Sequence, residues 1–223
     1  EVDALNEPQR LIPSGLVSIQ QIVLTIAVLL VSGVGLSIFS GSNVALLVGI
    51  GIVMALFYSA PPVRAKRNGW VGTTLVAISY EGLAWLAGHL AFASLAAPSV
   101  LFAALYSFGA HGIMSINDFK SMAGDKLSGI NTIPVLHGEK TAAFLIVTTM
   151  NLAQLGVLIA FVVWGRWLFV GLLTLLFLAQ IPQQRNFLRQ PVENHLKFSA
   201  VGVSFFVWGM MAAAIGIRFM IGS

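Results

Sequence analysis

The 223-residue sequence contains no cysteine and few charged residues. Only 9% of its residues are Asp, Glu, Lys or Arg, whereas soluble domains carry about 25%. Without cysteine, neither disulfides nor thiolate metal sites can contribute to the fold or the chemistry. Hydrophobic residues make up 57% of the chain, and its mean hydropathy is +0.90. The composition therefore excludes an ordinary soluble domain and indicates an integral membrane protein.

Seven apolar segments approach the roughly 20 residues that a helix needs to cross a bilayer. They cover Ser18–Phe39, Asn43–Tyr58, Trp70–Phe92, Pro98–Ile116, Thr141–Trp164, Trp167–Pro182 and Phe198–Ile221. Because lipid offers no hydrogen-bond partners to the backbone, each crossing is expected to be helical. No low-complexity linker separates the segments. The sequence therefore predicts an all-α polytopic membrane helix bundle of about seven transmembrane helices, in one domain spanning residues 1–223.

The charged residues predict the topology of this bundle. The formal net charge is +4, but the basic residues are scattered between apolar segments and do not indicate a nucleic-acid-binding protein. Seven crossings leave only Arg166 and Arg218 on one side of the membrane. The other side receives Arg10, Arg64, Lys66, Arg67, Lys120, Lys126, Lys140, Arg185, Arg189 and Lys197. Such a bias marks the cytoplasmic face, where most of the acidic residues also fall.

Three polar segments on this face require a chemical explanation. They read "EVDALNEPQR", "YSAPPVRAKRNGW" and "SINDFKSMAGDKLSG", from Glu1, Tyr58 and Ser115 respectively. Mg²⁺ prefers oxygen ligands and is often held by a few carboxylates together with substrate phosphates. Lys and Arg neutralise the remaining phosphate oxygens. The three segments together indicate a site for a divalent metal and a polyphosphate; ordinary solvated loop charges are the alternative.

Asp118 and Asp125 are the central carboxylates of the third segment. On a continuous helix they would lie on one face, two turns or about 10.5 Å apart. Gly124 argues against a continuous helix at this point.

The three segments resemble the cytoplasmic motifs of the UbiA superfamily of intramembrane prenyltransferases. The stretches that carry the resemblance are "NDFKSMAGDKLSGINTIPV", "DALNEPQRLIPSG" and "YSAPPVRAKRNGWVG". Within the superfamily, "NDFKS", "SYEGLAW" and "YSAPP" followed by a basic stretch are similar to the chlorophyll and bacteriochlorophyll synthase branch. "SYEGL" and "GAHGIM" lean towards its bacteriochlorophyll side. The resemblance covers nearly the whole chain.

The resemblance also implies where this chain begins. Family members have nine transmembrane helices, with a first aspartate-rich motif at the cytoplasmic end of the second helix. Asp3 matches the last aspartate of that motif, so the chain is expected to be N-terminally truncated and to lack the first two helices. In the second motif, Ser121 replaces an aspartate of the wider superfamily, and Ala123 stands where this branch often has glutamate. Either the second motif binds metal more weakly, or Ala123 faces away from the metal.

The implied reaction transfers a prenyl group between two membrane-soluble substrates. A geranylgeranyl or phytyl diphosphate would bind through Mg²⁺, its diphosphate would depart, and the propionate of a bacteriochlorophyllide would capture the allylic carbon. A propionate is already ionised near neutral pH, so no strong general base is required. Charge on the departing diphosphate is stabilised by metal ions and preorganised cations.

The resemblance assigns roles to individual residues of this sequence. Asp118 and Asp125 are expected to be catalytic, as is Tyr58, either as a hydrogen-bond donor to the diphosphate or as a stabiliser of the allylic cation. The expected metal ligands are Asp3, Asn117, Asp118 and Asp125. The expected diphosphate contacts are Arg64, Lys66, Arg67 and Lys120.

Glu81 stands out because an ionisable residue within a membrane segment is costly and often functional. Glu81, Trp85 and His89 follow at i, i+4 and i+8, on one side of one helix. They are expected to line the tetrapyrrole pocket together with His111, and His89 or His111 could ligate the chlorin magnesium. The alternatives are an interhelical hydrogen bond for Glu81 and hydrogen-bonded packing for either histidine.

Two other functional classes remain open at this stage. A UbiA-type enzyme with a quinone or haem acceptor would keep the diphosphate motifs but should lack "SYEGLAW". A pigment-delivery or assembly subunit of a photosynthetic membrane complex would bind pigment without turnover. The expected partners are prenyl diphosphate, bacteriochlorophyllide, lipids and photosynthetic pigment-protein subunits. The expected location is a bacterial inner or photosynthetic membrane, with the active-site loops on the cytoplasmic face.

Overall fold

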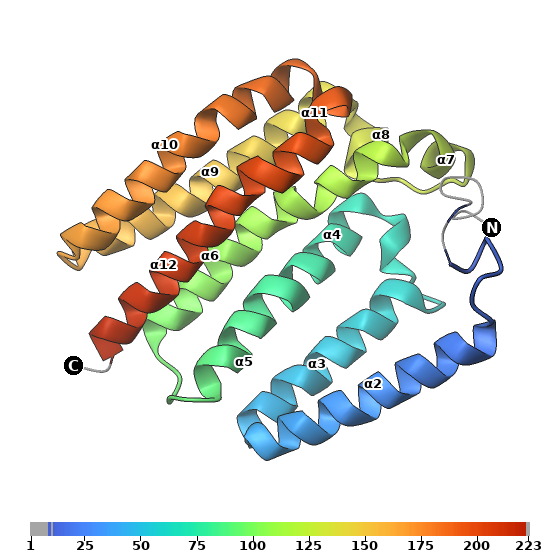
Figure 1. Cartoon of the computed structure of the whole chain (residues 1–223), viewed down its shortest axis with the longest axis horizontal. Coiled ribbons are helices and arrows are strands. Elements are labelled where there is room, and N and C mark those ends of the chain that lie inside the picture. The colour runs from blue at the N-terminus through green and yellow to red at the C-terminus, as the bar shows by residue number, and fades with distance from the viewer. Residues whose placement is uncertain (1–8, 10, 222–223) are drawn as a thin grey trace.

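The computed structural model describes residue 9 and residues 11–221, which form a bundle of helices (Figure 1). The long helices are α2 (Ile19–Ser40), α3 (Ser42–Ser59), α6 (Ala97–Met114), α9 (Glu139–Val163), α10 (Trp167–Arg189) and α12 (Val203–Ile221). Between α3 and α6 lie the 3₁₀ turn η1 (Ala65–Arg67) and the successive segments α4 (Gly69–Ala77), η2 (Ile78–Leu83) and α5 (Ala84–Leu90). The remaining short elements are η3 (Ser115–Lys120), α7 (Met122–Leu127), α8 (Ile133–His137), α11 (Pro191–Lys197) and η4 (Phe198–Gly202).

Six helical stretches within the described residues are long and apolar enough to cross a membrane. They match six of the seven predicted segments. The seventh, Trp70–Phe92, is helical from Gly69 to Leu90, but the π-helical turn η2 divides it into the shorter helices α4 and α5. A π-turn shifts the hydrogen-bond register of a helix and is frequent at functional sites. The predicted all-α membrane bundle is thus confirmed, with one crossing interrupted.

The ends of the helices follow from local sequence. Before α2, the backbone amide of Gln21 donates to Ser18 Oγ (3.3 Å), and the amide of Ser18 donates to Gln21 Oε1 (2.9 Å). This reciprocal capping satisfies amides that the first helical turn leaves unpaired. Gly41, with φ of 123°, then separates α2 from α3, a backbone angle that favours glycine. The two helices therefore form a hairpin at the lower edge of Figure 1.

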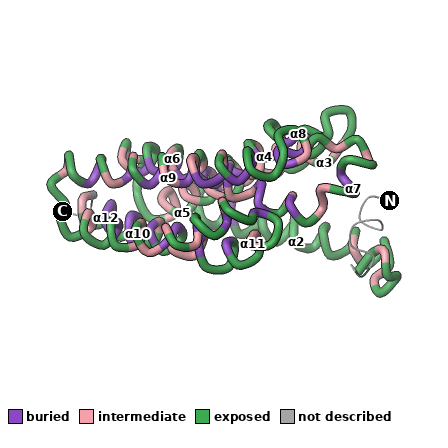
Figure 2. Tube along the Cα trace, turned by 90° about the horizontal axis from the view of Figure 1, so that it is seen from above, coloured by how far each residue is buried: buried purple, intermediate pink, exposed green. Residues whose placement is uncertain are grey.

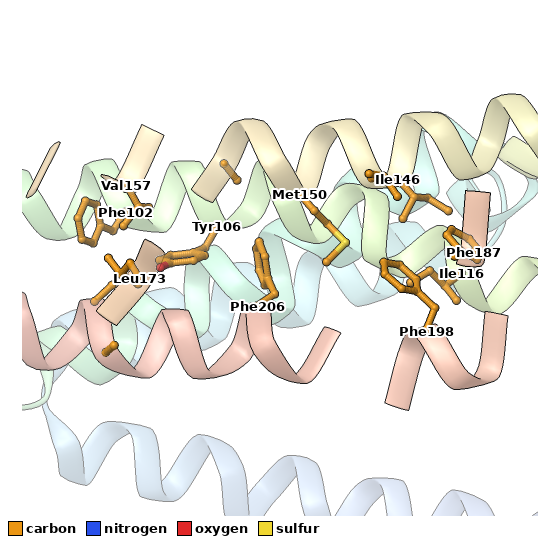
Figure 3. Packing of buried hydrophobic residues seen from close by; sticks show 14 of the residues in the cluster. Phe102, Tyr106, Ile116, Ile146, Met150, Val157, Leu173, Phe187, Phe198 and Phe206 are labelled. Atoms are coloured by element: carbon orange, nitrogen blue, oxygen red, sulfur yellow. The ribbon is translucent and has the colours of Figure 1, made fainter. Parts of the chain in front are cut away.

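The core lies between α6, α9, α10 and α12. In Figure 3, Tyr106 of α6, Met150 of α9 and Phe206 of α12 point into the space between their helices, and all three are buried. The rings of Tyr106 and Phe206 meet edge to face, with centroids 5.4 Å apart. Figure 2 shows the buried residues (purple) along α6 and α9, whereas α2 is mainly exposed (green). One side of the molecule is therefore tightly packed, whereas α2 leaves its apolar surface exposed.

Candidate active site

The loops that carry the predicted site residues gather at one end of the bundle (Figure 1). This end holds the loop between α3 and α4, the segment from η3 to α8, and α11. The short connections between α2 and α3, α5 and α6, and α9 and α10 lie at the opposite end. The alternation predicted from the charges is therefore reproduced by the helices, and the bundle has one polar end.

A short backbone contact joins the basic loop to the acidic motif. Asn68 and Asn131 form an isolated parallel bridge, in which the amide of Asn131 donates to the Arg67 carbonyl (3.0 Å) and the amide of Gly69 donates to the Asn131 carbonyl (2.7 Å). The approach requires glycine at position 69, because a Cβ there would lie 2.6 Å from the Ile133 amide nitrogen. The guanidinium of Arg67 consequently lies beside the loop that follows Asp125.

The two motif carboxylates lie close together, although the helix between them is interrupted. The 3₁₀ turn η3 ends at Lys120, and α7 begins at Met122. The break therefore falls at Ser121, while Gly124 lies inside α7, contrary to the expectation that glycine would cause it. Asp118 is half-buried and interacts electrostatically with the buried Asp125.

Ser121 holds the orientation of Asp125. The Ser121 hydroxyl donates to Asp125 Oδ2 at 2.6 Å, and the Asp125 amide donates to the Ser121 carbonyl at 2.9 Å. Only 6% of the Asp125 surface is exposed. A buried carboxylate fixed by a hydroxyl has a defined direction for its remaining lone pairs. Ser121, which replaces an aspartate of the wider superfamily, thus supports a neighbouring carboxylate.

Tyr58 brings the α3 helix into the same site. It is half-buried near the end of α3, and it interacts electrostatically with both Asp118 and Tyr80. The structure therefore brings Tyr58 and Asp118 together, as a shared catalytic role requires. Tyr80, directly before Glu81 in the sequence, was not among the predicted site residues.

The oxygen donors at this end fit a divalent cation. Asp118 and Asp125 supply two carboxylates, and the exposed Asn117 supplies an amide oxygen next to Asp118. Hard cations such as Mg²⁺ prefer such oxygen ligands and complete their shell with water and substrate phosphates. Across residue 9 and residues 11–221, no three His, Cys, Asp or Glu side chains cluster as a metal site. Asp3, the fourth expected ligand, lies outside the described residues.

One of the expected diphosphate contacts also borders a surface groove at this end of the bundle. Lys120 and Ala123 line a surface groove of about 750 Å³, together with Lys126, His137 and Lys140. This groove is lined by neither Asp118 nor Asp125. Ala123 is exposed on this groove.

The basic loop itself is open to solvent. Arg64, Lys66 and Arg67 are exposed, and Arg64 adopts a left-handed backbone with φ of 41°. Such a conformation is unfavourable for a residue other than glycine and occurs mainly where surrounding structure enforces it. The loop therefore presents three cations at the polar end.

The predicted tetrapyrrole residues are divided between two faces of the α4–η2–α5 segment. Trp85 stacks on Tyr106, with ring centroids 5.5 Å apart and planes at 29°, and Glu81 interacts electrostatically with Tyr106. His89 donates from Nε2 to the Ser94 carbonyl at 2.8 Å. Trp85 and His89 both line a cavity of about 790 Å³ between α5 and α12.

His111 does not belong to this group. It lines a different cavity, between α4–η2–α5 and α6, and its ring is stacked on Trp70, with centroids 5.6 Å apart. The expected set of four residues is therefore split. The physical reason is that His111 projects from α6 towards α4, whereas Trp85 packs on Tyr106 at another face of the same helix.

A cluster of four amides between α9 and α10 was not predicted from the sequence. Asn151 and Gln154 of α9 pair with Gln184 and Gln180 of α10. Gln184 donates to Asn151 Oδ1 at 2.6 Å, and the Gln154 and Gln180 amides donate to each other. Their signal was polar amides at spacings of three and four residues inside apolar segments. This amide ladder fixes the register of α9 against α10.

Comparisons with known proteins agree with the geometry. Residues 1–210 match the UbiA prenyltransferase family. The chain is 51% identical over 217 residues to the bacteriochlorophyll synthase 34 kDa chain of Chloroflexus aurantiacus, covering 97% of this chain and 70% of that protein. It is 41% identical over 231 residues to the bacteriochlorophyll synthase 33 kDa chain of Cereibacter sphaeroides, covering 97% and 72%.

A more distant relative and a solved structure agree with these matches. Chlorophyll synthase of Avena sativa is 36% identical over 223 residues, covering 96% of this chain and 59% of that protein. A solved structure from a study of digeranylgeranylglyceryl phosphate synthase in membranes shares the fold, with a TM-score of 0.69 and 22% identity over 96% of this chain and 76% of that one. The membrane bundle, its polar end and these matches together establish that this chain belongs to the UbiA prenyltransferase family.

Proposed function

We propose that this prenyltransferase is a bacteriochlorophyll synthase, which esterifies the propionate of a bacteriochlorophyllide with a geranylgeranyl or phytyl group taken from its diphosphate. The observation that carries the proposal is the 51% identity with a bacteriochlorophyll synthase over 97% of the chain. The site supports it, because paired carboxylates, a tyrosine and a basic loop meet at the end of an apolar bundle.

Different residues would bind the metal ion and the diphosphate of the prenyl substrate. Asp118, Asp125 and Asn117 would hold a divalent cation, with Asp3 as the further ligand implied by the family resemblance. When bound, that cation supplies Lewis-acid neutralisation of the diphosphate oxygens. Arg64, Lys66 and Arg67 supply fixed positive charge on the adjoining loop, which the Asn68–Asn131 bridge holds in place. The apolar helices accommodate the isoprenoid chain.

The chemical step breaks the allylic carbon–oxygen bond of the prenyl diphosphate, and its electron pair leaves with the diphosphate. A propionate oxygen of the bacteriochlorophyllide then forms the new carbon–oxygen bond with the allylic carbon. No proton transfer is needed, since the carboxylate is ionised before it reacts. Tyr58, beside Asp118, is placed either to donate to the departing diphosphate or to stabilise the allylic cation.

The polar end is proposed to face the cytoplasm of a bacterial inner or photosynthetic membrane. All the basic residues from Arg64 to Arg67 and from Lys120 to Lys140 lie at that end, whereas Arg166 lies in the turn between α9 and α10. Excess Lys and Arg mark cytoplasmic loops. This orientation gives the site access to a water-soluble metal ion while both organic substrates enter from the lipid.

The decisive experiment measures pigment esterification in membranes containing the protein at its natural length. Bacteriochlorophyllide, geranylgeranyl or phytyl diphosphate and Mg²⁺ are supplied to the wild type and to Asp118→Ala. The wild type should form the ester and the variant should largely fail. Absence of the ester from the wild type with both donors would overturn the proposal and favour another acceptor or a pigment-delivery role.

A further inference from the structure

A lipid-facing cavity separate from the carboxylate site lies where α4–η2–α5 packs against α6. Its volume is about 640 Å³, within the range of small-molecule pockets. Its wall runs from Trp70 to Leu86, 16 residues or about 24 Å of helix. Ile78, Val100 and Phe108 of this wall are 39%, 42% and 46% exposed. Because these apolar side chains belong to predicted membrane segments, the cavity opens sideways into lipid.

All but one of the polar groups that line this cavity are already hydrogen-bonded within the protein. The Ser107 hydroxyl donates to the Ala103 carbonyl (2.7 Å), and the Thr149 hydroxyl donates to carbonyls of its own helix (3.0 Å). None of the described residues that line the cavity is an Asp, Glu, Lys or Arg. A phospholipid headgroup would therefore find no countercharge here. His111 remains as the side chain able to contact a ligand.

The contacts of His111 determine which of its nitrogens is available. The Thr74 hydroxyl donates its single proton to the Trp70 carbonyl at 2.8 Å. With that proton on the Trp70 carbonyl, the 3.2 Å contact with His111 Nδ1 is one in which the imidazole donates from Nδ1. In a neutral imidazole the proton on Nδ1 leaves Nε2 with a free lone pair. A metal-binding histidine is commonly oriented in this way by a hydrogen bond at its other nitrogen.

We propose that this cavity binds a magnesium tetrapyrrole carrying a prenyl tail, with His111 Nε2 as the axial magnesium ligand and the tail lying along α5 towards Leu86. The four ring nitrogens leave an axial position of the magnesium open, which one imidazole can fill. The flat Trp70 ring lies beside His111, and the apolar part of the cavity continues beyond it. This shape matches a ligand with a flat head and a long hydrocarbon tail.

The identity of this ligand rests on the proposed function, because such a molecule is the product of that reaction. Neither Asp118, Asp125 nor Tyr58 lines this cavity, so it would hold the esterified pigment outside the carboxylate site. From there the pigment can move sideways into lipid or to an acceptor protein.

The test compares a magnesium pigment with its metal-free counterpart. The protein at natural length is placed in nanodiscs of a zwitterionic lipid and titrated with bacteriochlorophyll a and bacteriopheophytin a. Binding is followed by the Qx absorption band, which responds to the number of axial magnesium ligands, and by co-elution of pigment. The wild type should bind the magnesium pigment more tightly than the metal-free one. In His111→Leu the ratio of the two affinities should fall about 100-fold.

Two further variants separate axial ligation from a folding defect. Thr74→Val keeps the imidazole but removes the group that orients it, so the preference should fall about tenfold. Ser107→Ala removes a hydroxyl of the same cavity that already donates to the Ala103 carbonyl, and should leave the preference unchanged. Equal binding of both pigments by the wild type, or an unchanged preference in both His111→Leu and Thr74→Val, would overturn the proposal.

An esterification assay on the same wild-type nanodiscs distinguishes the two proposals. Esterification without a magnesium preference would refute the lipid-facing pigment site alone. A magnesium preference that depends on His111, without esterification, would refute the synthase proposal and leave a pigment-binding protein.

Discussion

The α2–α3 hairpin and the α6–α9 pair are both apolar enough to cross a membrane, but only the second is tightly packed. Within the membrane-spanning stretch of α2, 6% of the residues are buried, against 50% in the stretch that begins with α6. Ser37 is the only buried residue of α2, whereas α6 buries seven, including Ala103, Gly109 and Gly112. The small residues of α6 allow close helix approach, whereas a Cβ added at Gly33 or Gly35 of α2 would meet nothing within 4 Å.

The candidate active site joins these two regions. Tyr58 comes from the end of α3, and the basic loop follows it, while Asp118 and Asp125 extend from the packed helix α6. The acidic side of the site is therefore held by the core, and the tyrosine side depends on a less buried hairpin. We expect changes on the acidic side to affect catalysis most. Changes at the Asn68–Asn131 bridge, which is the joint between the two regions, should affect substrate binding.

The largest effect is expected from Asp125→Asn, which preserves the shape and the hydrogen bond from Ser121 but removes the charge. Losing one group that stabilises charge in a transition state typically lowers the rate by about 10²–10³-fold. Activity should be measured against Mg²⁺ concentration, and the variant should also require more of the ion. Glu139→Gln is the matched control, since Glu139 lines the outer groove at the same end. Full activity of Asp125→Asn at the usual Mg²⁺ concentration would contradict its role.

A smaller effect is expected when the joint between the two regions is disturbed by Gly69→Ala. The added Cβ would meet the backbone of Thr132 and Ile133 at 2.8 and 2.6 Å, and backbone cannot move aside easily. Overpacking costs about 1–3 kcal/mol, and about 1.4 kcal/mol corresponds to a tenfold change in affinity. KM for the prenyl diphosphate should therefore rise about tenfold, because the Arg67 loop is displaced from the motif. An unchanged KM would show that this bridge does not position the loop.

The contrast in packing can be tested with two matched glycine substitutions. At Gly112 of α6 a Cβ would overlap Thr149 Oγ1 and lie 2.9 Å from the Ile146 carbonyl oxygen, whereas at Gly33 of α2 it would meet nothing within 4 Å. Gly112→Ala should destabilise the protein by about 1–3 kcal/mol, and Gly33→Ala should be neutral or slightly stabilising. Thermal unfolding in detergent measures both. Equal loss of stability would mean that the hairpin is packed in solution as closely as the core.

Much of this architecture could be predicted from the sequence, since hydropathy and charge bias act along the chain. They gave the positions of the membrane segments, and the motifs gave the grouping of Asp118, Asp125 and Tyr58. The break at Ser121 and the π-turn at Ile78–Leu83 could not be predicted, because both depend on tertiary packing. Likewise, the separation of His111 from Trp85 depends on which face of a helix meets its neighbour, which a spacing rule cannot decide.

The amide ladder offers the smallest and sharpest test, because it lies within the packed region. Gln180 is fully buried and bonded to Gln154, so Gln180→Leu leaves a buried amide without its partner. Hydrogen bonds between membrane helices contribute about 0.6 kcal/mol on average and up to about 1.7 kcal/mol. Gln180→Leu should therefore lower the free energy of unfolding by about 0.6–1.7 kcal/mol. The double variant with Gln154→Leu should lose less free energy of unfolding than the sum of the two single variants, since no unpaired amide of this pair then remains. Strict additivity in this double-mutant cycle would show that the two amides act independently.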